Sequence, residues 1–192
     1  MGEYVTRILS NDEIKEIVVN IRDGYVGKDG TPHRPNPQIA TILLLQANLG
    51  CRICDIVNLS LENIDFDGDA WRLNLIEQKT GKPRPFIIPA PVKELIDNYC
   101  EIHNITSGRL FTVKEAAVWK QLRNVRDYLG LENVGTHSFR KSAGFRVYMD
   151  SGMDIALTTQ FYNHSSPNVT MRYLNRSSKQ MDEAISKSVC LL

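Results

Sequence analysis

Residues 62–89 read ENIDFDGDAWRLNLIEQKTGKPRPFIIP, and this stretch decides the fold class. Residues 71–76 and 86–88 have the alternating, apolar-rich pattern that is typical of half-buried strands. Residues 67–69 and 80–83 separate the apolar segments with the Asp, Gly and Pro residues that favour turns. The stretch therefore predicts a small antiparallel sheet of three strands.

The sequence before this stretch has helical periodicity. A capping box at residues 10–13, with the sequence SNDE, opens a helix that continues to about residue 23. Residues 24–37 contain three Gly and three Pro and are expected to form a loop. An apolar helix over 37–48 and a short helix over about 52–59 follow.

The sequence after residue 91 is helical again. Its apolar periodicity predicts helices over about 91–103, 114–129, 136–151, 154–162, 167–174 and 178–190. The expected architecture is mainly α with a small three-stranded antiparallel β-sheet insert. At ~150 residues per domain, the length of the chain predicts one compact domain over residues 1–175, followed by a tail helix over 176–192.

Composition excludes several classes of protein. Hydrophobic residues make up 42% of the chain and charged residues 23%, which is typical of a folded globular protein rather than a disordered one. The best apolar run, residues 39–45, is far shorter than the ~20 residues of a membrane span. The N-terminus lacks the positive charge and apolar core of a secretory signal. We therefore expect a cytoplasmic protein with no membrane partner.

The charges balance globally but are clustered locally. Lys and Arg total 23 and Asp and Glu total 22, and a net charge of +1 argues mildly against a dedicated nucleic-acid binder. The basic residues nevertheless fall into four clusters, which are Arg72–Arg84, Lys120–Arg126, Arg140–Arg146 and Arg172–Lys179. Each cluster alone is typical of a solvated face, but together they favour a shared basic surface.

The cysteines do not form a metal motif. Cys51 and Cys54 have the C-x-x-C spacing, but no second Cys or His pair accompanies them, and Arg52 between them would repel a cation. We expect all the thiols to be reduced and the chain to bind no metal.

The helix predicted over 136–151 carries the first chemical signal. At 100° per residue, His137, Arg140 and Lys141 share a face around Gly144, while Phe139 and its apolar neighbours lie on the other side. A solvated polar face is one interpretation. The other is a phosphate site, because a guanidinium binds phosphate oxygens in bidentate fashion and an imidazole can move a proton.

Three further segments carry reactive side chains. His164 precedes a short helix that Ser166 and Pro167 start, and Tyr173 lies near the end of that helix. Arg52 begins another helix, and Asp55, one turn on, could hold its guanidinium. A core aromatic and an ordinary surface ion pair are the alternatives. Residues 78–82, with Lys79 and Lys82, form a hairpin tip that could equally be a solvated turn.

Taken in order, these residues resemble the catalytic domain of tyrosine recombinases, the phage and mobile-element integrases. That family has Arg, a hairpin Lys, His-x-x-Arg, His or Trp, and Tyr in succession. The present chain has the same succession: Arg52, Lys79, His137, Arg140, His164 and Tyr173. The matching strings are LGCRICD, KTGK, THSFR and NHSSPNVTMRY, and the last is the most specific.

The chain departs from the family pattern at a few positions. Asp55 stands where Glu is common, Phe139 where Leu is common, and Asn163 where Gly usually precedes the His. None of these changes removes a reactive group. Family members usually carry an N-terminal core-binding domain, and with only about ten residues before the first helix we expect that domain to be absent.

The resemblance implies a role for each residue. Two arginines and a histidine would stabilise the phenolate of Tyr173, whose pKa is ordinarily near 10. Arg52 and Arg140 would hold the phosphate, Lys79 would protonate the leaving 5′ oxygen, His137 would assist proton transfer and His164 would bind the phosphate. Tyr173 would form a 3′-phosphotyrosine without metal, ATP or another cofactor. The expected DNA contacts are Lys82, Arg84, Lys141 and Arg172.

The resemblance also implies partners. We expect double-stranded DNA and other protomers in a synaptic tetramer, no small-molecule substrate, and a DNA-associated protein of bacterial or phage origin. Residues 178–190 carry an apolar stripe of Met181, Ala184, Ile185 and Val189, which packs either on its own domain or on a neighbouring protomer. A type IB topoisomerase and an inactive DNA-binding module are the alternative functions.

Overall fold

The computed structural model describes residues 6–174 of the 192-residue chain. The chain divides into two compact units, Met1–Ala143 and Gly144–Leu192, and each unit is described by itself. The structure is mainly helical with one small three-stranded antiparallel sheet, which confirms the predicted fold class. The predicted tail helix over 178–190 lies outside the described residues.

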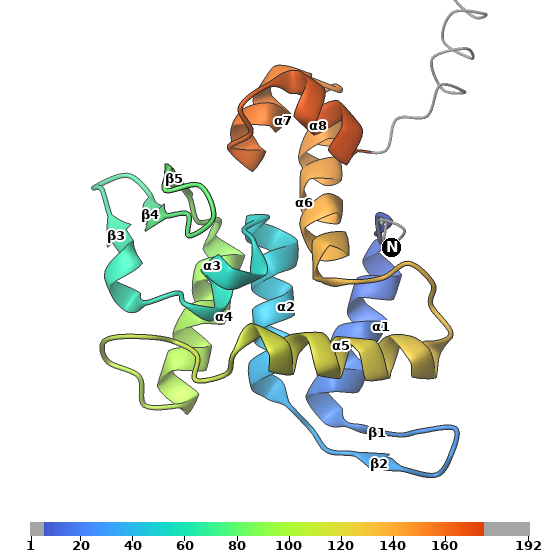
Figure 1. The fold of residues 1–192 in the computed structure, drawn as a ribbon. Coiled ribbons are helices and arrows are strands. Elements are labelled where there is room, and N and C mark those ends of the chain that lie inside the picture. The colour runs from blue at the N-terminus through green and yellow to red at the C-terminus, as the bar shows by residue number, and fades with distance from the viewer. Residues whose placement is uncertain (1–5, 175–192) are drawn as a thin grey trace, which may run out of the picture. The chain divides into compact units, whose positions relative to one another are not determined.

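The first unit holds most of the secondary structure (Figure 1). Its elements are α1 (Asn11–Asp23), β1 (Tyr25–Val26), β2 (Pro32–His33), α2 (Pro37–Leu49), α3 (Ile53–Val57), a 3₁₀ turn (Leu61–Asn63), β3 (Ile64–Phe66), β4 (Trp71–Ile76), β5 (Pro83–Ile87), α4 (Ala90–Ile102), α5 (Glu115–Leu129) and the first part of α6 (Thr136–Asp150). These bounds agree with the sequence-based helices to within a few residues.

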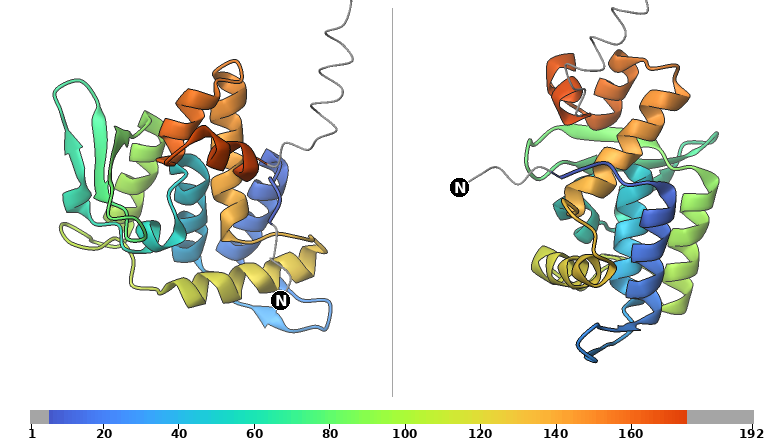
Figure 2. Two further views of the ribbon diagram at one scale, coloured as in Figure 1. Left: turned by 45° about the horizontal axis from the view of Figure 1, so that its top comes forward. Right: turned by 90° about the vertical axis from the view of Figure 1, so that its right-hand side faces the viewer.

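Helix α2 is the centre of the first unit. It is apolar around most of its circumference, so it is covered by α1, α3 and α4, and α5 runs across α1 and α3 (Figure 2). The side chain of Asn36 caps its start by accepting from the Ile39 amide at 3.1 Å. Gly50 ends it in the left-handed conformation at φ +60°, where glycine is favoured.

The expectation of a loop over 24–37 was wrong for four residues. Tyr25 pairs with His33 and Val26 with Pro32, so β1 and β2 form a short antiparallel hairpin. The Tyr25 ring stacks on His33 at 4.3 Å between centroids and on Tyr128 of α5 at 4.5 Å. This aromatic stack holds the hairpin in spite of its Gly and Pro residues.

The three-stranded sheet runs in the order β3-β4-β5. Leu73 and Leu75 of β4 lie on its inner face and are buried. Leu75 pairs with Arg84 of β5, so the register turns the Arg84 side chain inward as well. The sheet thus delivers one arginine to the interior of the unit.

The second unit comprises the remainder of α6, then α7 (Ile155–Tyr162) and α8 (Pro167–Tyr173). Asp154 caps α7 by accepting from the Ala156 and Leu157 amides, and Asn163 ends α7 at φ +56°. Helices α7 and α8 pack on each other around Tyr148, Tyr162 and Leu174. Within residues 6–174, every helix is too short or too polar to cross a bilayer.

The capping box of α1 supplies a stability prediction. Ser10 Oγ accepts from the Glu13 amide at 3.1 Å, and the Glu13 carboxylate accepts from the Ser10 amide at 2.8 Å. Ser10→Ala removes the first bond and should lower the free energy of unfolding by about 1 kcal/mol. Urea denaturation followed by circular dichroism measures this, with the exposed Ser107→Ala as a control. Equal losses in the two variants would contradict the capping role.

Candidate active site

The carbonyl of Gly50 is a meeting point for two guanidinium groups. Arg140 of α6 is 1% exposed, and its Nη1 donates to Gly50 O at 2.7 Å. Arg84 of β5 donates from Nη2 to the same carbonyl at 3.4 Å and to Leu49 O at 3.2 Å. The last turn of α2 leaves these carbonyls without helical partners, so they are natural acceptors for cations.

The carboxylate of Glu77 is a second point where two guanidinium groups meet, and Glu77 was not predicted from the sequence. Its carboxylate is fully buried, with Oε2 2.6 Å from Arg52 Nη1 and Oε1 3.2 Å from Arg84 Nη1. Thr80 Oγ1 also donates to Oε2 at 2.7 Å. Burial is the largest influence and opposes ionisation, but the hydrogen bonds of Thr80, Arg52 and Arg84 and the charge of Arg52 together outweigh it and place the pKa of Glu77 below its ordinary value.

Glu77 had a signal in the sequence. Residues 73, 75 and 77 alternate inward from β4, so an acidic residue at the third of these positions faces the interior. A carboxylate at an interior position requires a cationic partner. Arg84, which faces inward from the neighbouring strand, is that partner.

The expectation that Arg84 contacts DNA is corrected by the structure. The side chain is 4% exposed and is bonded to Glu77 and to the end of α2. The Arg84 guanidinium therefore links Glu77 to the end of α2 in the interior of the unit and does not reach the surface.

The expectation that Lys141 contacts DNA is also corrected. Residues 6–9 cover this part of α6, where Lys141 Nζ donates to Thr6 O at 2.6 Å and the Leu9 amide donates to Ser142 Oγ at 2.8 Å. Lys141 is therefore buried, and burial lowers its pKa. The helical wheel identified the side on which Lys141 lies, but the segment that covers it is remote in the sequence.

Asp55 braces the hairpin rather than Arg52. It is buried, and its Oδ1 accepts from the Gln78 amide at 2.9 Å, at the base of the turn that carries Lys79. Arg52 instead forms an ion pair with Glu77. The supporting role of Asp55 thus applies to the turn.

Four of the predicted catalytic residues lie in the first unit. His137 lies exposed in the first turn of α6. Desolvation by the surrounding protein lowers the pKa of His137, and the charges of Arg140, Lys79 and Arg52 lower it further. Lys79 and Lys82 are exposed on the turn between β4 and β5.

The second unit holds the other two predicted catalytic residues around Tyr162. The buried Tyr162 ring stacks on His164 at 4.8 Å and meets Tyr173 edge-on at 4.9 Å. His164 and Tyr173 are also edge-on, at 5.4 Å. His164 Nδ1 lies 3.0 Å from Thr170 Oγ1. Tyr162 was not identified from the sequence.

Gly144 provides the space that Tyr162 occupies. A Cβ atom at residue 144 would lie 1.9 Å from Tyr162 Cζ, a distance that no side chain tolerates. The group that approaches this glycine is therefore the Tyr162 ring of the same chain. Arg172, an expected DNA contact, is exposed on α8.

Within residues 6–174, no group of three or more His, Cys, Asp or Glu side chains has a metal-binding arrangement. Cys51, Cys54 and Cys100 are free thiols, and Cys190 lies outside the described residues. Burial raises the pKa of Cys51 and of Cys54 to about 11 each, so these thiols are protonated at neutral pH.

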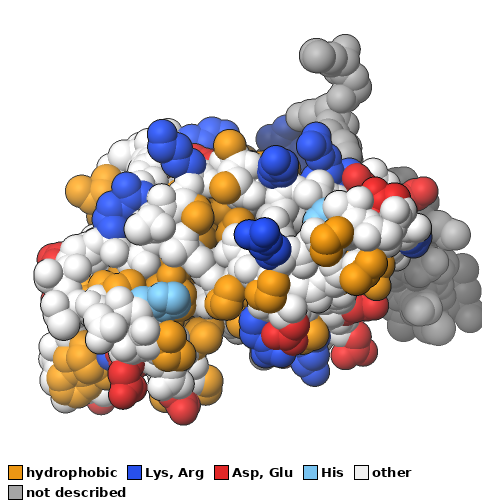
Figure 3. Space-filling model, turned by 90° about the horizontal axis from the view of Figure 1, so that it is seen from below, with side chains coloured by type: hydrophobic (Ala, Val, Ile, Leu, Met, Phe, Trp, Pro, Cys, Tyr) orange, Lys and Arg blue, Asp and Glu red, His pale blue; other side chains and the backbone are white. Residues whose placement is uncertain are grey.

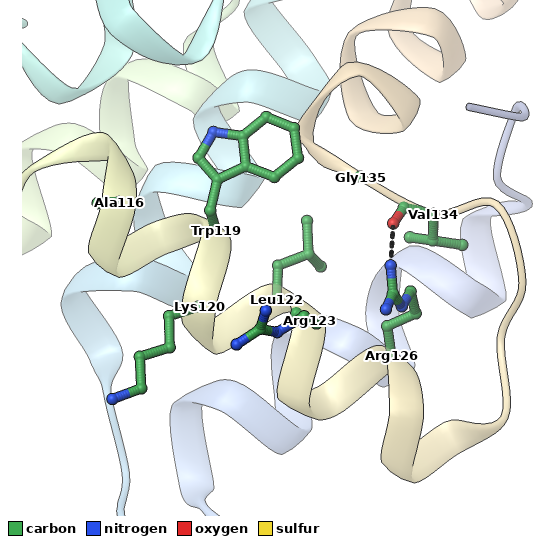
Figure 4. A pocket seen from close by; sticks show the side chains of 8 residues that line it. All are labelled: Ala116, Trp119, Lys120, Leu122, Arg123, Arg126, Val134 and Gly135. Atoms are coloured by element: carbon green, nitrogen blue, oxygen red, sulfur yellow. Dashed lines mark hydrogen bonds between the residues drawn. The ribbon is translucent and has the colours of Figure 1, made fainter. Parts of the chain in front are cut away.

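Helix α5 carries a separate concave surface in the first unit. A pocket of about 490 Å³ lies against Trp119, Leu122 and Gly135, with Lys120 and Arg123 beside it (Figure 4). It contains none of the predicted catalytic residues.

The face of the molecule seen from below carries charges of both signs. Basic side chains are spread over this face with acidic ones between them (Figure 3), which agrees with the small net charge of the chain.

Comparison with known proteins identifies relatives for nearly the whole chain. Residues 7–180 match the family model described as the phage integrase family. The chain is 30% identical to the probable integrase/recombinase YoeC of Bacillus subtilis, over 69% of this chain and 75% of that protein. It is 28% identical to the tyrosine recombinase XerA of Pyrococcus furiosus, over 94% of this chain but only 61% of XerA.

Solved structures show the same fold. The catalytic domain of bacteriophage HP1 integrase superposes with a TM-score of 0.65 at 18% identity and covers 95% of both chains. A XerA recombinase gives a TM-score of 0.68 at 17% identity, over 98% of this chain and 66% of that one.

The contact between Gly144 and Tyr162 supplies a prediction. Gly144→Ala should displace the Tyr162 ring and lower the free energy of unfolding by about 1–3 kcal/mol, the usual effect of overpacking. Tyr162→Leu removes the ring, so the added methyl group should cost much less in the double variant. Thermal unfolding of the two single variants and the double variant measures this coupling. Additive effects would show that the two residues do not compete for the same space.

Proposed function

Because the chain belongs to the phage integrase family and is a tyrosine recombinase catalytic domain, we propose that it cuts and rejoins DNA at specific sites through Tyr173. One observation carries the assignment of residues. Arg52 and Arg140 are linked through Glu77, Arg84 and the Gly50 carbonyl, and their charges, with that of Lys79, lower the pKa of His137. Such a group of fixed cations suits a scissile phosphate.

Arg52 would hold a non-bridging oxygen of the phosphate. Arg52 retains 15% exposure of its side chain, and the Glu77 carboxylate fixes its position. Arg140 is fixed by Gly50 O and is as buried as Arg84, so it would add its positive charge from inside the unit. Because the protein fixes both cations beforehand, they need little reorganisation as negative charge develops in the transition state.

The proton transfers fall to His137 and Lys79. The phenol oxygen of Tyr173 attacks phosphorus and gives its proton to His137, whose lowered pKa makes the imidazole neutral at pH 7. The bond from phosphorus to the 5′ oxygen breaks, and Lys79 supplies the proton that this oxygen needs. The product is a 3′-phosphotyrosine and a free 5′ hydroxyl. The reverse reaction with another strand rejoins the DNA.

The second unit prepares the nucleophile. Tyr173 is held edge-on by Tyr162 and His164, which restricts rotation of its ring. The contact at Nδ1 with Thr170 orients the His164 ring for a hydrogen bond to the phosphate.

Double-stranded DNA and further copies of the chain are the proposed partners. Structures of similar fold include a XerH recombinase bound to its difH substrate and a lambda integrase dimer bound to a core site. Lys82 and Arg172, both exposed, remain the proposed DNA contacts. We propose assembly as a synaptic tetramer on paired sites, with no metal or ATP taking part.

Exposed apolar side chains support a contact between protomers. Phe145 and Met149 lie one helical turn apart on α6, Met153 lies in the turn after α6, and Leu157 lies on α7, and all four are exposed. The sequence of the tail, residues 176–192, predicts an apolar stripe at Met181, Ala184, Ile185 and Val189. Docking of the tail of one protomer on a neighbour would bury apolar surface on both sides.

Tyr173→Phe tests the nucleophile. This variant lacks the attacking oxygen and should form no denaturation-resistant adduct on a nicked suicide DNA substrate. Tyr162→Phe, a matched change in the same aromatic cluster, should retain the adduct because it keeps the ring that holds Tyr173 edge-on. Gel electrophoresis under denaturing conditions measures both. An adduct from Tyr173→Phe would exclude this residue as the nucleophile.

An assay with the wild-type protein distinguishes recombination from topoisomerase activity. A recombinase joins strands from two sites, whereas a type IB topoisomerase relaxes a supercoiled plasmid that carries no such sites. Efficient relaxation of that plasmid by the wild-type chain would favour the topoisomerase.

Deletion of residues 178–192 tests the tail. Binding to a single DNA site should be unchanged within about twofold, because the proposed phosphate contacts lie outside the tail, while formation of paired-site complexes should fall at least about tenfold, a coupling of ~1.4 kcal/mol. Native gel shifts with one-site and two-site DNA measure the two quantities. Equal pairing by the truncated and full chains would contradict tail docking.

A further inference from the structure

We propose that Glu77 is a positioning residue that fixes the guanidinium of Arg52 for its work on the phosphate. This inference rests on the proposed function and adds a residue to it. Glu77 lies directly after β4 and before the turn that carries Lys79. Its role follows from its three side-chain partners and from its complete burial.

The two oxygens of the carboxylate have different partners. Oε2 receives Arg52 at 2.6 Å and the Thr80 hydroxyl at 2.7 Å, while Oε1 receives Arg84 at 3.2 Å. Arg84 is in turn held by Leu49 O and Gly50 O. The carboxylate is therefore immobilised from one side by Arg84, so it can serve as a fixed anchor for Arg52 on the other.

The anchor of Arg52 lies outside its own helix. Arg52 stands at the N-cap of α3, where its side chain makes no capping bond, and Asp55 one turn on directs its Oδ1 to the Gln78 amide. A guanidinium on a long, flexible stem loses much rotamer freedom when it is held in one place. The buried ion pair with Glu77 provides the compensating interaction.

Glu77 also fixes the turn that carries Lys79. Its amide donates to Lys82 O at 2.9 Å, and its carbonyl accepts from the Gly81 amide at 2.8 Å. Together with the Thr80 bond, these contacts close the turn over residues 77–82. Glu77 thus holds both the Arg52 guanidinium and the base of the turn that carries Lys79, the proposed proton donor.

A positioning role and a merely structural role predict different results for Glu77→Gln. The amide of Gln still offers one oxygen, but it replaces the second oxygen with an N–H donor and removes the negative charge, so one guanidinium loses its acceptor. If Glu77 acts through Arg52, cleavage slows because the guanidinium shifts, while the overall affinity for DNA changes little. If Glu77 only supports the fold, thermal stability falls without a specific effect on the chemical step.

The test is a mutant cycle on the rate of adduct formation with a suicide substrate at saturating DNA. Glu77→Gln should slow the rate by about 100-fold, as expected for an ångström-scale misplacement of a catalytic group. In the Arg52→Lys background, where the bidentate fork is already lost, the same change should slow it by less than about threefold. DNA affinity, measured on Tyr173→Phe versions, should change by less than about threefold.

The matched control is Asp67→Asn. Asp67, in the turn after β3, pairs with Arg72 of β4, but both side chains are partly exposed, so the rate should be unchanged. Wild-type protein without adduct would refute the proposed function itself. If the wild-type protein forms the adduct, two results would refute the positioning role. One is that Glu77→Gln forms the adduct at the wild-type rate. The other is that Glu77→Gln slows the rate by the same factor with Arg52 and with Arg52→Lys.

Thermal unfolding shows whether each variant is folded. If Glu77→Gln does not fold, Glu77→Asp completes the same cycle, because it keeps the buried charge and only shortens its reach. It should slow adduct formation by about tenfold with Arg52 present. The loss should again nearly vanish in the Arg52→Lys background, and an equal loss in both backgrounds would overturn the proposal.

Discussion

Burial of a charged group in a protein is unfavourable unless an opposite charge or a polar acceptor meets it, and the first unit is arranged around this constraint. Arg140 and Arg84 converge on the carbonyl of Gly50, and Arg84 and Arg52 converge on the carboxylate of Glu77. Arg84 contacts both acceptors, so the three arginines form one continuous network. The protein itself thus fixes the cations that the proposed reaction needs, and the left-handed turn at Gly50 presents one of the two acceptors.

Local sequence signals were sufficient for most of the fold because the elements begin and end at residues with strong local preferences. The capping box at Ser10, Pro37 at the start of α2 and Gly50 at its end all act within one helical turn. The β1–β2 hairpin could not be predicted in this way. It depends on Tyr128 stacking on Tyr25, and these residues lie about a hundred positions apart in the sequence.

The candidate site shows the same division between local and remote information. The order of the motifs indicated Arg52, Lys79, His137 and Arg140, and in the first unit the charges of the other three residues lower the pKa of His137. Periodicity gives the side of an element on which a residue lies, but it does not show what covers that side. Residues 6–9 cover Lys141, and the inward register of β5 buries Arg84, so neither is the surface contact that was expected.

The small net charge of the chain does not argue against a phosphate ligand, because the field at a site depends on the charges nearest to it. In the first unit, the arginine network and its neighbours Lys79 and Lys141 contribute five positive charges, while Glu77 and Asp55 contribute two negative ones. His137 responds to this excess: after desolvation, neighbouring cations are the cause of its lowered pKa. A neutral imidazole among fixed cations can accept a proton while the cations stabilise an anion, and acid–base catalysis at a phosphodiester requires both. Glu77 thus fixes the geometry of the cations while offsetting only part of their charge.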